Sequence, residues 1–229
     1  MARRRTAVLI SGGGSNLQAL LDATAQDAVA AEIVLVISNR ADAHGLERAR
    51  RAGVPAKLIA HDRFATREAF EAVVDRALRK AGVELVCLAG FMRRLTASFV
   101  AAWHDKLLNI HPSLLPVFRG LRPHERALEA GVRISGCTVH LVRAEVDAGP
   151  ILVQGVVPVQ ADDTAETLAR RVLEIEHLAY PQALLLFAAG RLRVEGERVV
   201  AGDPAAEAAR LLLHPALRAQ PTISIAAKK

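Results

Sequence analysis

The chain has 229 residues, of which 52% are hydrophobic and 3% aromatic, and its 30 basic and 24 acidic residues give a net charge of +6. This length and apolar content favour one α/β domain with a short tail and a core of mainly aliphatic side chains. Of the basic residues, 25 are arginines scattered among acids, and no basic block is interleaved with aromatics, so the composition argues against nucleic-acid binding. The net positive charge would still favour the binding of anionic small molecules such as phosphates.

The cysteines and the apolar segments indicate the cellular compartment of the protein. Cys87 and Cys137 each lie in an apolar run, which predicts buried, reduced thiols and not a disulfide or a metal site. The apolar stretch after residues 1–5 ends at Ile10, too short for a signal peptide, and no run approaches the length of a membrane span. The sequence therefore predicts a cytoplasmic protein that binds neither a membrane nor a metal.

The first predicted strand, 6–10, leads into a glycine-rich loop. Ser-Gly-Gly-Gly-Ser-Asn occupies residues 11–16, and leucines at 17, 20 and 21 follow at helical spacing. A glycine loop between a strand and a helix allows backbone N–H groups to hold a phosphate, although the loop is neither a Walker loop nor a G-x-G-x-x-G motif. The alternative interpretation is a tight turn with Ser15 as the helix N-cap.

The clearest helix is 66–81, where apolar residues recur at i, i+3, i+4, i+7 and i+8, with Thr66 as candidate N-cap. The strand at 83–89 is continuously apolar, as expected of a parallel strand covered on both faces. The loop at 90–95 follows it, where α/β folds place ligands; core packing by Phe91 and Met92 is the alternative. The other predicted strands are 32–38, 54–60, 107–111, 134–142 and 151–159; the other helices are 43–52, 97–103, 123–130 and 164–187, the last with a kink or break at Pro181; and 191–200 is a predicted hairpin.

Alternating strands and helices in this number predict a Rossmann-like, three-layer α/β fold with a mostly parallel, twisted sheet of about seven strands. In such a fold the carboxyl ends of the parallel strands meet at one edge of the sheet and form the binding site. We therefore expect the glycine loop, the 90–95 loop and the end of the 107–111 strand to lie near one another.

The segment 106–120 carries the strongest chemical signal. Asn109 and His111 stand two apart in a strand that ends at Pro112, so their side chains project from the same face. An amide that can donate to an oxyanion, beside an imidazole that titrates near neutral pH, fits acyl or formyl transfer; a polar pair at a strand end is the alternative. Asp147, in a loop between apolar flanks, is either a turn acid or the carboxylate that orients an imidazole.

Five motifs then carry a family resemblance: S-G-G-G-S-N-L-Q, S-N-R-A-D-A-H-G-L-E-R-A, L-A-G-F-M-R, N-I-H-P-S-L-L-P and V-D-A-G-P-I-L, in this order and with matching gaps. Over roughly residues 5–195 the chain resembles the phosphoribosylglycinamide formyltransferases, folate-dependent enzymes of purine synthesis. The resemblance implies that 10-formyltetrahydrofolate is the co-substrate and that its formyl group passes to the glycine amine of 5-phosphoribosylglycinamide. It also implies that the amine attacks directly and that no metal takes part. The expected partners are small molecules only, and the expected oligomeric state is a monomer or homodimer. The catalytic domain would span 1–200, with a tail at 201–229.

The resemblance also assigns roles to individual residues. Asn109 and His111 would stabilise the oxyanion, and Asp147 would favour the charged form of His111. The substrate phosphate would be bound by Gly14, Ser15 and Asn16, with Glu176 at the sugar-phosphate end. His140 would support the catalytic trio. The implied formyl-folate site consists of Arg67, Met92, Arg93, Arg94, Leu95 and Asn109.

Some positions depart from the family pattern and bear on the choice of acceptor. Gly13, Arg94 and Leu173 replace residues usual in the family, and the segment 117–123, with Arg119 and Arg122, resembles the methionyl-tRNA formyltransferases instead. Those enzymes normally carry a second, β-rich domain, and formyltetrahydrofolate hydrolases an N-terminal regulatory domain. A phosphate- or nucleotide-binding regulator without activity is the non-enzyme alternative, and it would predict a broken catalytic trio.

Overall fold

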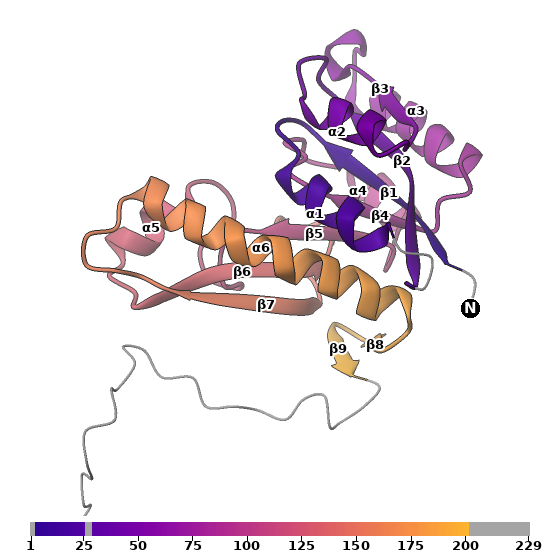
Figure 1. The fold of residues 1–229 in the computed structure, drawn as a ribbon. Coiled ribbons are helices and arrows are strands. Elements are labelled where there is room, and N and C mark those ends of the chain that lie inside the picture. Colours follow the sequence, from indigo (N-terminus) through magenta and orange to yellow (C-terminus); the bar gives the residue numbers. More distant parts are fainter. Residues whose placement is uncertain (1–2, 26–28, 202–229) are drawn as a thin grey trace, which may run out of the picture.

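The computed structural model describes residues 3–25 and 29–201, and a seven-stranded sheet forms its centre (Figure 1). From β3 to β5 the strands are parallel, whereas β6 pairs antiparallel with both β5 and β7. This arrangement confirms the predicted Rossmann-like, mostly parallel sheet of about seven strands. In spatial order the strands are β3 (Ala56–Leu58), β2 (Ala31–Ser38), β1 (Arg4–Ile10), β4 (Leu85–Leu88), β5 (Leu107–His111), β6 (Ile134–Leu141) and β7 (Ile151–Pro158).

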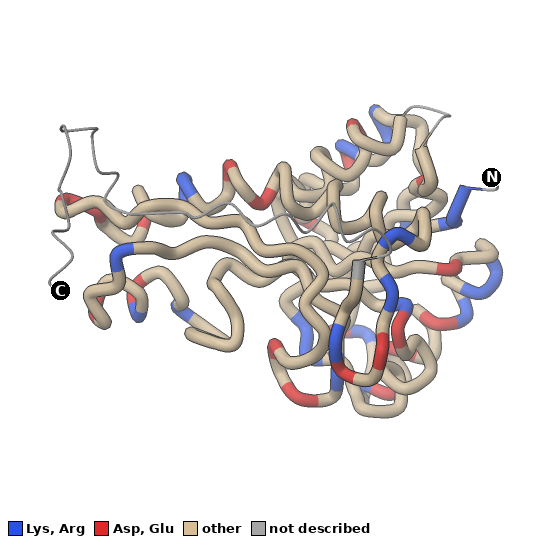
Figure 2. Tube along the Cα trace, turned by 90° about the horizontal axis from the view of Figure 1, so that it is seen from below, with Lys and Arg blue, Asp and Glu red and all other residues tan. Residues whose placement is uncertain are grey.

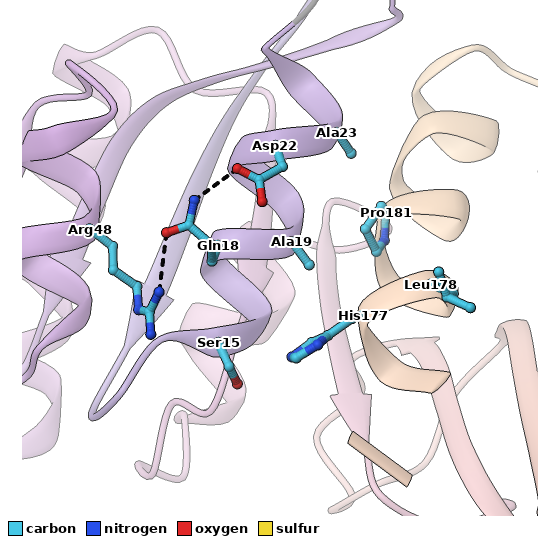
Figure 3. Close-up of a pocket in the computed structure, with 9 residues that line it drawn as sticks. All are labelled: Ser15, Gln18, Ala19, Asp22, Ala23, Arg48, His177, Leu178 and Pro181. Carbon is cyan, nitrogen blue, oxygen red and sulfur yellow. Dashed lines mark hydrogen bonds between the residues drawn. The ribbon is translucent and has the colours of Figure 1, made fainter. Parts of the chain in front are cut away.

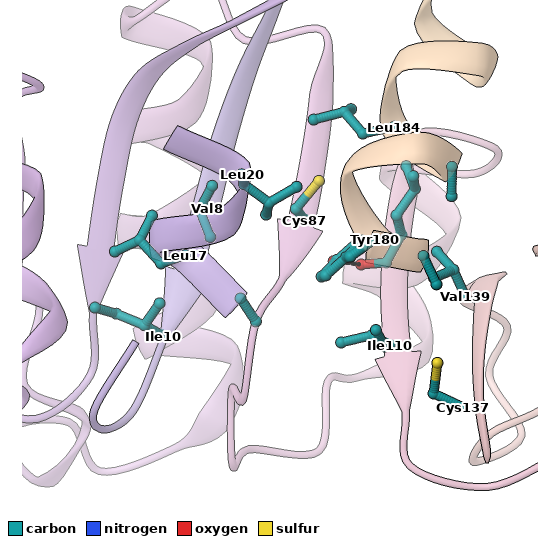
Figure 4. Packing of buried hydrophobic residues seen from close by; sticks show 14 of the residues in the cluster. Val8, Ile10, Leu17, Leu20, Cys87, Ile110, Cys137, Val139, Tyr180 and Leu184 are labelled. Atoms are coloured by element: carbon teal, nitrogen blue, oxygen red, sulfur yellow. Dashed lines mark hydrogen bonds between the residues drawn. The ribbon is translucent and has the colours of Figure 1, made fainter. Parts of the chain in front are cut away.

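Helices cover both faces of the sheet, so the fold has three layers. On one face lie α1 (Ser15–Thr24), α2 (Gly45–Arg51), α5 (Pro123–Glu129) and α6 (Ala165–Ala188). Their apolar side chains join a buried cluster around Leu17, Leu20 and Tyr180 (Figure 4). On the other face α3 (Arg67–Lys80) and α4 (Ala97–Ala102) contribute Phe70, Trp103 and their neighbours to a second cluster. A rigid sheet between two cores leaves the strand ends available for a site.

The long helix α6 lies along β6 and β7, as Figure 1 shows, and small residues permit this close approach. A Cβ atom on Gly155 would lie 2.4 Å from Ile175 of α6, and a Cβ atom on Gly136 would lie 1.9 Å from the carbonyl oxygen of Gly155. Both distances are far below normal contact, so a side chain at either glycine would displace backbone or helix. Gly155 therefore permits the close approach of α6 to β7, and Gly136 permits the close approach of β6 to β7.

Most predicted elements are present, with their ends shifted by a few residues, and Thr66 caps α3 by accepting from the Ala69 N–H at 3.1 Å. Two interpretations were wrong. The N-cap of α1 is Gly14 and not Ser15, because the chain turns there through a left-handed conformation with φ 73°. Helix α6 runs through Pro181 as one 24-residue helix, so the predicted break is wrong, whereas the alternative of a kink stays a prediction. The predicted hairpin is β8 (Leu192–Glu195) with β9 (Arg198–Ala201).

Basic and acidic residues are interspersed along the trace (Figure 2), in keeping with the scattered arginines of the sequence. Cys87 and Cys137 are buried and free, as predicted, and burial raises the pKa of both thiols to about 12. Within the two described ranges no helix is long and apolar enough to cross a membrane, and no group of three His, Cys, Asp or Glu residues could hold a metal ion. The predicted tail, apart from Ala201, lies outside the described residues.

Candidate active site

Asn109 and His111 lie at the end of β5, on the face toward which β6 also presents a histidine. In the antiparallel register Asn109 pairs with His140, and His111 pairs with Thr138. The Asn109 Nδ2 atom lies 3.2 Å from Nε2 of His140. The expectation that Asn109 and His111 share one face is therefore confirmed, and His140 joins them.

The protonation of His140 follows from its partners. Its Nδ1 atom lies 3.0 Å from the carbonyl oxygen of Leu141, which can only accept, so Nδ1 carries the hydrogen. The other nitrogen, Nε2, then accepts from the amide of Asn109. His140 is buried, and burial lowers its pKa, which favours this neutral form. The contact orients the Asn109 amide nitrogen and leaves its second hydrogen for a ligand.

His111 is buried and has an acceptor at each ring nitrogen. Its Nδ1 atom lies 3.2 Å from Oδ2 of Asp147, and its Nε2 atom lies 3.0 Å from the carbonyl oxygen of Phe118. A neutral imidazole could donate to only one of them, so the arrangement suits a ring that carries hydrogens on both nitrogens. Both ring nitrogens of His111 therefore face hydrogen-bond acceptors.

Asp147 pairs with His111 and lies near His140. Besides its contact with His111, its Oδ1 atom lies 3.9 Å from Nε2 of His140, and its Oδ2 atom accepts from the Gly120 N–H at 2.8 Å. The residue adopts a left-handed backbone conformation, with φ 48°, in the loop between β6 and β7. Asp147 is therefore both a turn residue and the imidazole partner, and the structure brings Asn109, His111 and Asp147 together.

The glycine loop lies between β1 and α1 and packs against the start of α2. A Cβ atom on Gly14 would lie 2.8 Å from the Cα atom of Gly45, so only glycine fits at this N-cap. Asn16, in the first turn of α1, donates to Oε2 of Glu176 at 2.6 Å, and burial raises the pKa of Glu176. The Oδ1 atom of Asn16 is buried without a partner in the described part of the chain. These groups form a polar site at a helix N-terminus, which favours anions.

The predicted folate loop leaves the sheet beside the catalytic strand, because Leu88 at the end of β4 pairs with Asn109. The Met92 N–H donates to Ser11 Oγ at 2.8 Å, which ties this loop to the end of β1. Phe91 stacks on Phe70 of α3 with ring centroids 6.5 Å apart, so Phe91 packs as the alternative interpretation expected. Met92, by contrast, is 71% exposed and available to a ligand.

The remaining predicted folate residues are placed around this loop. Arg67 is exposed at the first residue of α3 and, in the chain as described, makes no hydrogen bond or ion pair. Arg93 and Leu95 are half-buried and Arg94 is exposed. The structure brings this loop next to Asn109 through the β4–β5 pairing, while it shows no contact between Arg67 and the loop among the described residues.

Sequence reasoning missed three groups that support the site. The Phe118 carbonyl and the Gly120 N–H hold His111 and Asp147 through backbone atoms, which no side-chain motif reveals. Tyr180, the only tyrosine of the chain, donates its buried hydroxyl toward the carbonyl oxygens of Leu88 and Leu108, at 3.0 and 3.2 Å. A lone tyrosine inside an apolar helix face was the available signal for this contact.

The segment 117–123, which departs from the family pattern, thus contacts His111 and Asp147 through its backbone. Its two arginines point elsewhere: Arg119 pairs with Glu145 at 2.6 Å, and Arg122 lies 3.5 Å from Glu125 at the start of α5. Both arginine pairs are exposed, so each contributes little to stability. The departure therefore changes the surface near the site and leaves the contacts to His111 and Asp147 in place.

Comparison with known proteins identifies the family of the chain. The formyl transferase family model matches residues 4–184. Phosphoribosylglycinamide formyltransferase of Escherichia coli is 44% identical over 187 residues, which cover 82% of this chain and 88% of that protein. The trifunctional purine biosynthetic protein adenosine-3 of Gallus gallus is 54% identical over 190 residues, but the chain spans only 19% of its length.

A solved structure is similarly close. Glycinamide ribonucleotide transformylase 1 of Symbiobacterium toebii superposes with a TM-score of 0.85 at 51% identity, over 88% of this chain and 95% of that one. These findings confirm the resemblance that the five motifs predict. The chain belongs to the formyl transferase family.

Proposed function

We propose that the protein transfers the formyl group of 10-formyltetrahydrofolate to the glycine amine of 5-phosphoribosylglycinamide in purine biosynthesis. The observation that carries the proposal is the cluster at the carboxyl end of β5, in which Asn109 contacts His140 and Asp147 contacts His111. The names of the relatives above support formyl transfer and the choice of acceptor. We assign the activity to residues 1–200, with 201–229 as a tail, and the two free thiols support a cytoplasmic setting.

The proposed reaction needs no protein nucleophile. The substrate amine attacks the formyl carbon, a new C–N bond forms, and the carbonyl oxygen becomes an oxyanion. The Asn109 amide and the Nε2–H of His111 stabilise that charge, the second by exchanging the Phe118 carbonyl for the oxyanion. The amine then loses a proton, the C–N10 bond breaks, and N10 takes up a proton to release tetrahydrofolate. Asp147 holds the Nδ1–H of His111 throughout and favours the charged ring.

The remaining residues act at different parts of the two substrates. Neutral His140 accepts from Asn109 and so directs the amide toward the formyl oxygen. Glu176 and the Oδ1 atom of Asn16 face the sugar end, where hydroxyl groups can supply the missing partner. Gly14, Ser15 and Asn16 offer backbone N–H groups to the phosphate. The residues Arg67, Met92, Arg93, Arg94 and Leu95 bind the folate on the other side of Asn109.

Changing Ser15 to glutamate tests the phosphate site. The carboxylate would stand at the N-terminus of α1 and repel the phosphate, so we expect KM for glycinamide ribonucleotide to rise by about 10- to 100-fold. KM for 10-formyltetrahydrofolate should change less than about threefold. Ser15→Ala is the control, because it keeps the backbone N–H and should alter either KM only slightly. An equal rise for both substrates would contradict the assignment.

The function itself is tested by offering purified protein three acceptors with 10-formyltetrahydrofolate: glycinamide ribonucleotide, methionyl-tRNA and water. We expect formyl transfer to glycinamide ribonucleotide at a kcat/KM at least about a hundredfold above the other two, within the range of ordinary enzymes. Preferred transfer to methionyl-tRNA would instead favour the interpretation suggested by segment 117–123. Release of formate as the main product would indicate a hydrolase, and no reaction at all would favour a binding protein.

A further inference from the structure

A cavity of about 600 Å³ opens beside the glycine loop, between α1, α2 and α6 (Figure 3). Its polar lining consists of Ser15, Gln18, Asp22, Arg48 and His177. Ser15 belongs to the loop assigned above to the phosphate, whereas Arg48 and His177 have no role in the reaction as described so far. The cavity therefore extends the phosphate site toward two side chains that can carry positive charge.

His177 is the residue in this cavity with an unused hydrogen-bonding atom. Its Nε2 atom is buried, yet among the described residues it has no hydrogen-bond partner. Figure 3 shows its ring extending from α6 toward the first turn of α1, where Ser15 lies. Buried polar atoms are almost always hydrogen-bonded, so this atom calls for a partner from outside the described chain.

The neighbouring residue on α6 faces a different group. Glu176 accepts a hydrogen bond from Asn16 at 2.6 Å, on the side of the site assigned above to the sugar. The ring of His177, the next residue in sequence, extends toward Ser15 (Figure 3). Helix α6 thus presents two adjacent side chains to two sides of the first turn of α1, an acid to one side and an imidazole to the other.

Arg48 lies on the opposite side of the cavity from His177. Its Nε atom donates to the carbonyl oxygen of Gly13 at 2.9 Å, and its Nη1 atom donates to Oε1 of Gln18 at 3.2 Å. These contacts hold a guanidinium at the loop. Asp22, the one carboxylate among the described residues that line the cavity, accepts from Gln18 at 2.8 Å. The charge nearest the loop is therefore positive, which suits an anion.

We propose that His177 binds the phosphate of the acceptor substrate through its Nε2–H, and that it closes from α6 the site that Ser15, the N-terminus of α1 and Arg48 form on the other side. The inference rests on the proposed function and assigns a specificity role to His177. A hydrogen bond from an imidazole to a phosphate is charge-assisted and therefore stronger than a neutral one. Selection of a phosphorylated acceptor over its unphosphorylated counterpart depends in part on this contact.

Two substitutions of the same residue test the proposal. His177→Asn keeps a polar group near the Nδ1 position and removes Nε2, whereas His177→Gln places an amide near the Nε2 position. His104→Asn, at an exposed histidine after α4, is the matched control. The acceptors are glycinamide ribonucleotide and the same molecule without its phosphate.

We expect His177→Asn to lower kcat/KM for the phosphorylated acceptor by about 10- to 100-fold, as for a lost bond to a charged group. Activity with the unphosphorylated acceptor should stay within about twofold of wild type. His177→Gln should recover most of the loss, and His104→Asn should match wild type with both acceptors. Equal losses with both acceptors, or no loss with either, would overturn the proposal.

Calorimetry with ribose 5-phosphate and with ribose separates this inference from the proposed function, because it needs no catalysis. We expect wild type to bind ribose 5-phosphate more tightly than ribose, and His177→Asn to lose about tenfold of that preference. If the preference depends on His177 while no formyl transfer is detected, the proposed function fails and the phosphate ligand stands. If transfer is normal and the preference does not depend on His177, the inference is wrong and the proposed function stands.

Discussion

Replacing Asp147 by asparagine is expected to lower kcat by about 10³-fold, because His111 loses the carboxylate that favours its charged form. Asparagine has nearly the same shape and can still accept the N–H of Gly120, so the loop should keep its conformation. The free energy of unfolding should therefore change by less than about 1 kcal/mol. Initial rates with saturating substrates, together with a denaturation curve, measure both quantities.

The control for this substitution is Glu145→Gln, two residues earlier in the same loop. Glu145 pairs with Arg119 at the surface and does not contact either histidine. We expect turnover close to wild type, since an exposed ion pair contributes little. If Asp147→Asn retained wild-type turnover, or if both substitutions reduced it equally, the catalytic assignment of Asp147 would be wrong.

Replacing Asn109 should have the second large effect. Asn109→Leu removes the amide donor while nearly keeping its size, and we expect kcat to fall by about 10²- to 10³-fold, as for other oxyanion donors. Asn109→Asp should be worse, because it replaces a donor by a negative charge facing the developing oxyanion. The measurement is kcat with both substrates saturating, with KM for each substrate as a check on binding.

Which of the two Asn109 variants is the less active distinguishes a catalytic role from a structural one. Both variants remove the donor to the Nε2 atom of His140, but aspartate keeps the shape and polarity of asparagine, so a purely structural role would make leucine the more damaging change. An aspartate variant more active than the leucine variant would therefore argue against oxyanion stabilisation by Asn109.

Much of the fold and part of the site follow from local pattern. Burial shapes the sequence pattern directly in two segments. The continuous apolar run at 83–89 predicts a buried strand, and β4 forms there; the helical spacing at 66–81 predicts an amphipathic helix, and α3 forms there. The shared face of Asn109 and His111 follows from the period of a strand, which holds wherever the strand forms. The family motifs supplied the rest of the trio, and its three members do meet in the structure.

What local pattern could not supply is contact between distant segments. Asp147 lies far from His111 in sequence, and only the antiparallel return of β6 and β7 brings it within 3.2 Å. The carbonyl of Phe118 and the N–H of Gly120 act through the backbone, so their side chains carry no signal. The role of Gly14 as N-cap depended on a close contact with Gly45, which spacing along the chain does not express.

Helix α6 has a consequence for which acceptors can react. Glu176 and Tyr180 stand one turn apart on it: the first contacts Asn16 at the sugar end, and the second is bonded to the carbonyl of Leu108, directly before Asn109. Under the proposed function, a single helix therefore sets the separation between the end of the acceptor bound beside Asn16 and the position near Asn109 where its amine reacts. An acceptor one methylene longer would miss the formyl carbon by about 1 Å, a misplacement that costs on the order of a hundredfold in rate. The length of the acceptor would then limit which molecules react, in addition to their chemical groups.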